Sequence, residues 1–270
     1  MTYAGGVLCD LCDNVNVVDI FSRALGQHAG QIANRQQQQR KRWSAYEHIV
    51  FNGWFVREVG AWGTGDGQFR DPCGVAMAPN GDIWVADRGN HRIHQFNSSG
   101  KVLRAIGFRG RVEGQLENPS GIALSPDGKF IYVADRGNDR VAVFNLDGAC
   151  TGIIGSGTGK AQGCMQGPCD VAVRPDGQLA VCDYGNNRIQ VFDSGTCTKI
   201  LGANEAADEG HHRLLQPSAV CYNREGQIVV ADYGNHRVVV FGEDGYVCKA
   251  IVREGNGNGF NGPSALGIGR

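Results

Sequence analysis

The stretch Trp84–Phe96, WVADRGNHRIHQF, decides how this sequence of 270 residues is interpreted. It places one aspartate, two arginines and two histidines close together, a density of polar groups that suits an active site or a nucleic-acid contact. Three copies follow it: VADRGNDRVAVF, VCDYGNNRIQVF and VADYGNHRVVVF. Such regular recurrence indicates a repeat architecture. The repeated aspartates are Asp87, Asp135, Asp183 and Asp232, at steps of 48, 48 and 49 residues.

A second repeated element precedes each copy, and the two elements together predict four short strands per repeat. Alternation is clear in RIHQF and RVAVF, and β-branched residues are frequent in the repeat, which favours half-buried strands. NG, DG and GN pairs supply the positive φ that tight hairpin turns need. Four antiparallel strands in a period of 40 to 50 residues are typical of a β-propeller blade. The second element begins at Pro72, Pro119, Pro168 and Pro217, and a fifth copy begins at Pro263.

We therefore predict an all-β fold, a single β-propeller over residues 1–270 with six blades of four antiparallel strands. A degenerate blade is expected over residues 26–60, where SAYEHIVFNGWFVREVG indicates two strands and QHAGQIANRQQQQRKRW lacks strand character. Strands from residues 1–25 are expected to complete the closing blade, whose first strand lies in 253–270, because joining the chain ends removes open sheet edges. Full repeats are expected at 61–108, 109–155, 156–202 and 203–252.

Composition narrows the class of protein. The 41 glycines fit many tight turns, and a net charge of −1 gives no overall attraction to nucleic acid or anionic lipid. No apolar run approaches the ~18 residues of a membrane span. Cysteines at equivalent points of separate blades should lie too far apart for disulfides, which predicts free thiols and a cytoplasmic location. Pairing of Cys164 with Cys169, which share a loop, is the alternative.

The repeated aspartate and arginine are interpreted as structural. The aspartate ends the second strand and can accept turn amide hydrogens, while the arginine begins the third strand and can bind a carboxylate with paired hydrogen bonds. An active site needs one constellation, whereas four equivalent copies indicate a structural staple. The pairs are Asp87 with Arg92, Asp135 with Arg140, Asp183 with Arg188, and Asp232 with Arg237.

These residues resemble the NHL-repeat family, through P-x-G-V-A, V-A-D-x-x-N-x-R-I-x-V-F and the intervening G-x-G-D-G-Q-F, over about residues 46–270. The sequence is most similar to the propellers at the C-terminus of tripartite-motif proteins. That resemblance implies a module that recognises proteins or RNA stem-loops, often joined to a ubiquitin-ligase half. The sequence has no ring-finger or B-box pattern, because its single CxxC (Cys9, Cys12) lacks a second pair at zinc-site spacing. Ligase activity would therefore need a part outside this sequence.

The turns between second and third strands share one rim with the loops that link blades, and we call this rim the top face. Loop rims carry function on rigid scaffolds. Arginines beside exposed aromatics suit RNA and also a protein hot spot. Acidic neighbours on the same rim favour a protein partner, and the basic stretch 35–42 is a second element of positive charge. The predicted binding residues are Arg88, His91, Arg109, Arg111, Arg136, Tyr184, Tyr233 and His236.

Catalysis is the minority hypothesis. NHL propellers also occur in a zinc-containing peptide-amidating lyase, so the resemblance allows a metal-dependent lyase or hydrolase in the central channel. No motif places its ligands on this sequence, and function cannot be transferred from fold alone. We expect a non-enzymatic recognition scaffold without cofactor or metal. Its partner is expected to be a protein, with RNA as the alternative and neither DNA nor membrane involved.

Overall fold

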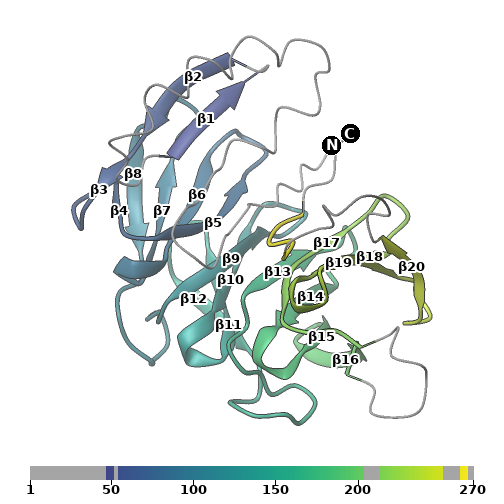
Figure 1. Ribbon diagram of the computed structural model, residues 1–270. Coiled ribbons are helices and arrows are strands. Elements are labelled where there is room, and N and C mark those ends of the chain that lie inside the picture. The colour runs from purple at the N-terminus through teal and green to yellow at the C-terminus, as the bar shows by residue number, and fades with distance from the viewer. Residues whose placement is uncertain (1–46, 52–53, 204–212, 252–261, 267–270) are drawn as a thin grey trace.

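The computed structural model describes residues 47–51, 54–203, 213–251 and 262–266, and is all-β (Figure 1). Four antiparallel sheets of four strands follow one another along the chain, and we call them blades 1 to 4. Blade 1 contains β5 (Pro72–Met77), β6 (Ile83–Asp87), β7 (Arg92–Phe96) and β8 (Val102–Ile106). Blade 2 contains β9 (Pro119–Leu124), β10 (Phe130–Asp135), β11 (Arg140–Asn145) and β12 (Cys150–Ile154). Blade 3 contains β13 (Asp170–Val173), β14 (Leu179–Asp183), β15 (Arg188–Asp193) and β16 (Thr196–Leu201), and blade 4 contains β17 (Pro217–Tyr222), β18 (Ile228–Asp232), β19 (Arg237–Phe241) and β20 (Val247–Ile251).

The strands of each blade pair in chain order, and the blades are joined through their first strands. β5 contacts β9, β9 contacts β13, and β13 contacts β17, so these strands form the inner side of an arc of blades that Figure 1 shows. A 3₁₀ turn connects the second and third strands of every blade. The turns are η2 (Arg88–Asn90), η3 (Arg136–Asn138), η4 (Tyr184–Asn186) and η5 (Tyr233–Asn235).

The predicted propeller class is confirmed, and the number of complete blades in the described residues differs from the predicted six. The described residues form four complete blades and one antiparallel hairpin, β1 (Glu47–Phe51) with β2 (Trp54–Val59). A two-residue pair, β3 (Ala61–Trp62) with β4 (Gln68–Phe69), lies in the loop before blade 1. No strand is assigned within 262–266, and the closing strands expected from residues 1–25 lie outside the described residues. The same is true of residues 26–46 in the expected degenerate blade.

The core lies between blades and repeats with them. The third strand of each blade ends near a phenylalanine that is almost fully buried. Phe144, Phe192 and Phe241 lie in apolar clusters that combine two neighbouring blades, whereas Phe96 packs with residues of blade 1 and with Phe69 of the loop before it. Each buried phenylalanine contributes about 1.5 to 3 kcal/mol of hydrophobic stabilisation. The core is therefore a series of apolar clusters, three of which join neighbouring blades. The four phenylalanines are Phe96, Phe144, Phe192 and Phe241.

Glycines allow the first strands of adjacent blades to approach closely. A Cβ added to Gly74 would overlap the carbonyl oxygen of Ser120 on the next inner strand. Gly121 donates its N–H to the carbonyl oxygen of Cys169 at 2.9 Å, and a Cβ there would overlap Asp170. The missing side chains at these two positions set the spacing of blades 1, 2 and 3. Among the described residues, no helix has the length and apolar character that a membrane span requires.

Candidate functional site

A buried aspartate organises the top face of every blade, and blade 3 shows the arrangement most completely. The Asp183 carboxylate accepts the backbone N–H of Gln166 at 2.7 Å, the Asn186 side-chain amide at 2.8 Å and Arg188 Nε at 2.7 Å. The carboxylate is fully buried, so each of these charge-assisted bonds forms away from water. The structure places Asp87, Asp135 and Asp232 in the same position, bound by Arg92, Arg140 and Arg237.

The arginine of each pair extends the arrangement to the loop that links the blades. Arg188 donates to the backbone carbonyl oxygens of Lys160, Ala161 and Cys164 at 2.7 to 2.9 Å. Arg140 binds the equivalent carbonyls in the loop before blade 2. A guanidinium satisfies several carbonyls at once because its donors form a rigid planar fork. The glycine-rich loops of the top face are thereby held in one conformation.

Burial disfavours the ionised form of one of these carboxyl groups, that of Asp135. It raises the pKa of Asp135, although the hydrogen bonds from Glu117, Asn138 and Arg140 act in the opposite direction. In blade 1, the buried His94 imidazole also lies beside the aspartate, with Nε2 at 3.3 Å from Asp87 Oδ2.

The residue after each 3₁₀ turn links its blade to the next one. These residues have left-handed backbone conformations, with φ between 53° and 57°. In each case a side-chain atom accepts a backbone N–H from the segment that precedes the next inner strand. The bonds run to His91 from Asn118 at 3.1 Å, to Asp139 from Gly167 at 2.7 Å, to Asn187 from Gln216 at 2.8 Å and to His236 from Gly262 at 2.9 Å.

Carboxylates of the linking loops face two of the four arginines that were predicted to form a basic sector. Arg88 Nε donates to Asp71 Oδ2 at 2.7 Å, so the guanidinium lies along its own blade and is mostly covered. Arg109 Nε lies 3.4 Å from Glu117 Oε1, although 74% of its side chain stays exposed. Two of the four predicted cations are thus neutralised by loop carboxylates. The positive charge available to a phosphate backbone is correspondingly smaller.

The remaining predicted residues divide between packed and exposed positions. The Arg136 guanidinium stacks on the Tyr184 ring at 5.2 Å, so this tyrosine does not offer that face to a ligand, and burial raises its pKa. Tyr233 is half-buried, and its ring lies against the backbone of Gly262. Arg111 is exposed, and its backbone carbonyl accepts a bond from an arginine of the next blade. His236 is exposed beside its inter-blade bond.

Three exposed apolar side chains on the top face were missed by the sequence reasoning. Trp62 is 59% exposed, Phe108 62% and Val112 64%, although large apolar side chains are usually covered. Trp62 carries the Arg70 guanidinium at 5.5 Å from its ring centre. The signal was present in the sequence, because these residues interrupt glycine-rich linking loops. Phe108 and Val112 occupy slots that hold only glycine or alanine in the loops before blades 1 and 3, and Trp62 occupies the slot of Arg109 and Thr158.

Hydrogen bonds join the loops that carry these residues into one surface. Asn90 of the first 3₁₀ turn donates to the carbonyl of Gly63, and Asn138 of the second donates to that of Gly110, both at 2.8 Å. His91 Nδ1 accepts the backbone N–H of Asn118, and this bond joins the turn at 88–91 to the linking loop at 107–118. We call the resulting surface, formed by residues 60–71, 88–91, 107–118 and 136–139, the top-face strip.

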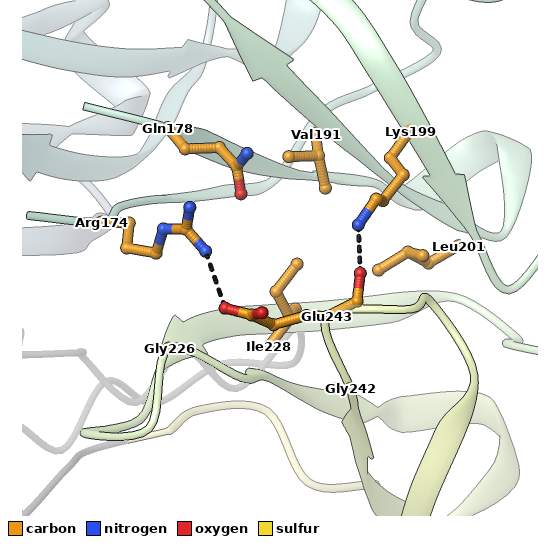
Figure 2. A pocket seen from close by; sticks show the side chains of 9 residues that line it. All are labelled: Arg174, Gln178, Val191, Lys199, Leu201, Gly226, Ile228, Gly242 and Glu243. Carbon is orange, nitrogen blue, oxygen red and sulfur yellow. Dashed lines mark hydrogen bonds and ion pairs between the residues drawn. The ribbon is translucent and has the colours of Figure 1, made fainter. Parts of the chain in front are cut away.

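Two further features bring charged or titratable side chains together. A pocket of about 200 Å³ lies between blades 3 and 4, on the rim opposite the 3₁₀ turns, and Figure 2 shows Arg174 and Lys199 converging on Glu243. Lys199 donates to the Glu243 carbonyl oxygen, while Arg174 binds Asp176 and lies 3.7 Å from Glu243 Oε1. Arg174 lowers the pKa of Asp176 to about 2. Both cations of the pocket are therefore engaged within the protein, and we assign no ligand to it.

A second cluster lies on the inner strands of blades 3 and 4 and on the neighbouring strand β14. Asp170 occupies a slot that holds glycine or alanine in the other blades, and its Oδ2 accepts the Val220 N–H at 2.9 Å. Burial raises the pKa of Asp170 to about 7, the pKa of Cys221 to about 12 and the pKa of Cys182 well above its usual value. Thiols held neutral in this way are poor nucleophiles and poor metal ligands. The cysteines whose side chains the structure describes are free, including Cys164 and Cys169.

Comparison with known proteins identifies the repeat. The family model named NHL repeat matches residues 69–96 and 214–241, which contain the Asp–Arg pairs of blades 1 and 4. The chain carries NHL repeats. A model named Lactonase, 7-bladed beta-propeller, matches 99–201, the region between the two NHL matches. Among curated proteins, the B-box type zinc finger protein ncl-1 of Caenorhabditis elegans is 48% identical to the NHL chain over 44 residues, which are 16% of this chain and 5% of that protein.

Solved structures share the fold of the NHL chain at low identity. A protein of unknown function from Bacteroides caccae is 15% identical with a TM-score of 0.56, over 75% of this chain and 73% of that one. A catalytically inactive virginiamycin B lyase from Staphylococcus aureus is 14% identical with a TM-score of 0.55, over 72% and 58%. Hydrazine synthase from Kuenenia stuttgartiensis is 20% identical with a TM-score of 0.51, over 72% and 55%. These likenesses show a propeller fold, and the NHL chain spans little more than half of the two enzymes.

Proposed function

We propose that this NHL propeller is a non-catalytic recognition scaffold that binds a protein through the top-face strip. The observation that carries the proposal is the exposure of Trp62, Phe108 and Val112 on loops fixed by buried staples. Apolar and aromatic side chains next to arginine are enriched where protein interfaces concentrate their binding energy. Because the loops are already held rigid, little conformational entropy is lost when they bind.

Two alternatives are weaker on specific grounds. Binding of an RNA stem-loop would use Arg70, Arg109 and Arg111 with the exposed aromatics, but the carboxylates of Asp71 and Glu117 lie among them. Catalysis is suggested by the lyases among the similar structures. In the described part of the chain, no group of three His, Cys, Asp or Glu side chains is placed to hold a metal ion. A role in choosing substrates for a ubiquitin ligase would require a ligase from another part or partner.

The proposal is tested by site-specific photo-crosslinking from position 108 in cells, followed by binding of the identified partner to purified protein. We expect the double substitution Phe108→Ser with Val112→Ser to weaken that binding by about tenfold or more, the scale of a hot-spot loss. Leu103→Ser with Ile153→Ser is the matched control, because these exposed apolar residues lie on the outer strands β8 and β12. The control should change affinity by less than about twofold.

The same experiment separates the classes of partner. Protein binding through an apolar patch should change little with salt, whereas neutralising three phosphates would give a slope of log affinity against log salt near about −2 to −3. Nuclease-sensitive crosslinks with such a slope would replace the protein proposal by the RNA alternative. Equal crosslinking from positions 108 and 103 would show that the top-face strip is not the binding surface.

A further inference from the structure

The inter-blade bond made by His91 depends on a titratable lone pair, unlike the equivalent bond in blade 3. The acceptor in blade 3 is the side-chain amide of Asn187, which does not titrate, and in blade 2 it is the carboxylate of Asp139. The acceptor at His91 is imidazole Nδ1, which loses its lone pair when the ring is protonated. Imidazole is the side chain whose change of charge serves most often as a pH switch in proteins.

Two groups compete for His91 Nδ1. The backbone N–H of Asn118 donates to it at 3.1 Å and needs a lone pair there. The Glu117 carboxylate oxygen Oε1 lies 3.7 Å from the same nitrogen and needs a proton there. Glu117 is also the carboxylate that faces Arg109, at 3.4 Å from Nε. A proton on His91 would therefore exchange one partner for the other and draw Glu117 away from Arg109.

We propose that His91 is a proton-operated latch on the top-face strip. In its neutral form it ties residues 107–118 to the turn at 88–91 through the Asn118 amide. In its protonated form it releases that amide and binds Glu117. The proposal rests on the proposed function, because the loop that the latch holds carries the exposed Phe108 and Val112 of the binding surface.

The surrounding charges are arranged so that the latch acts on this loop. The carboxylate facing His91 from the next blade is Glu117, and Arg109 is the cation behind it. On the 3₁₀ turn itself Arg88 is held by Asp71, whose carboxylate comes from the loop before blade 1. The carboxylate that responds to protonation of His91 is thus Glu117, on the loop formed by residues 107–118. Protonation should therefore change the order of that loop rather than of the turn at 88–91.

Amide hydrogen exchange measured by NMR tests the latch without any partner. After correction for intrinsic exchange, the protection of the Asn118 amide should fall by about threefold to tenfold between pH 7.5 and pH 5.5, the scale of one ordinary hydrogen bond. The Gln216 amide, which Asn187 accepts, is a control within the same molecule and should keep its protection. His91→Asn supplies the blade 3 acceptor in blade 1 and should abolish the pH dependence at Asn118.

The outcomes are decisive in both directions. Parallel behaviour of the Asn118 and Gln216 amides, or the same pH dependence in His91→Asn, would overturn the latch. The Arg109 Nε resonance supplies a second measurement and should shift with the imidazole of His91 in wild type only. These measurements involve no ligand, so failure of the latch and failure of the protein-binding proposal are distinguishable. With the crosslinked partner in hand, the ratio of its dissociation constants at the two pH values should be larger for wild type than for His91→Asn.

Discussion

Replacing Asp183 by alanine removes the acceptor that joins the 3₁₀ turn of blade 3 to the loop before it. The carboxylate accepts bonds from Gln166, Asn186, Arg188 and, at 3.1 Å, from Gln190 Nε2. The Arg188 side chain is almost fully buried, so the substitution leaves its charge without a counterion away from water. Breaking a buried ion pair from one side costs about 3 to 5 kcal/mol. The carbonyl partners of Arg188 remain, so we expect a loss near about 4 kcal/mol.

Urea unfolding followed by circular dichroism measures this loss. Asp183→Asn keeps the shape and one acceptor oxygen, and should lose about half as much as alanine. Asp66→Ala is the matched control, because Asp66 is exposed on a linking loop and should change stability by less than about 0.5 kcal/mol. Loss of less than about 1 kcal/mol in Asp183→Ala would contradict the staple argument, since it would mean that water replaces the carboxylate without penalty. Protection of the Gln166 amide should fall in the same variant, which ties the loss to the loop.

Three further outcomes follow from the first and second strands of the blades. The pKa of Asp170 is raised to about 7 from 3.8, so the folded state favours the protonated form and stability should fall as pH rises from about 4 through 7. The loss should reach about 2 to 4 kcal/mol by pH 8 and vanish in Asp170→Asn, measured as unfolding free energy against pH. Gly74→Ala should destabilise by more than about 2 kcal/mol through overlap with the Ser120 carbonyl, whereas Gly152→Ala, which meets nothing within 4 Å, should not. Cys182 should stay unlabelled by a thiol reagent in the native protein and react after unfolding, as read by peptide mass spectrometry.

The repeating part of the fold could be predicted because its determinants are local. β6 ends at Asp87 and β7 begins at Arg92, as the position of the pair in the sequence indicated. The turn between them needs only three residues and a left-handed position at His91. The residues that form this turn and its Asp–Arg pair are neighbours in the sequence. Four copies of the same pattern distinguish it from a chance match. The number of blades could not be predicted in the same way, because it depends on which strands pair with partners that are distant in the sequence.

The charge state of the candidate site could not be predicted for a related reason. Asp71 has a left-handed backbone, with φ of 55°, and this conformation places its carboxylate beside Arg88, seventeen residues away in sequence. Glu117 reaches Arg109 within its own loop and His91 from the preceding blade. The sequence shows which charges share a rim but not which of them meet. An inventory of arginines therefore overestimates the positive potential of such a surface.

The loops between blades show how one backbone can carry different chemistry. Trp62 pairs with Phe69, Arg109 with Leu116 and Thr158 with Met165, each as a parallel bridge at the same place in successive linking loops. The second residue of each bridge is buried, and this constant apolar contact fixes the loop. The first residue is an aromatic ring, a cation and a hydroxyl in turn, and all three are exposed. Because the scaffold contact is the same in the three loops while the outward group differs, recognition is expected where the copies diverge, and for this chain that is the top-face strip of blades 1 and 2.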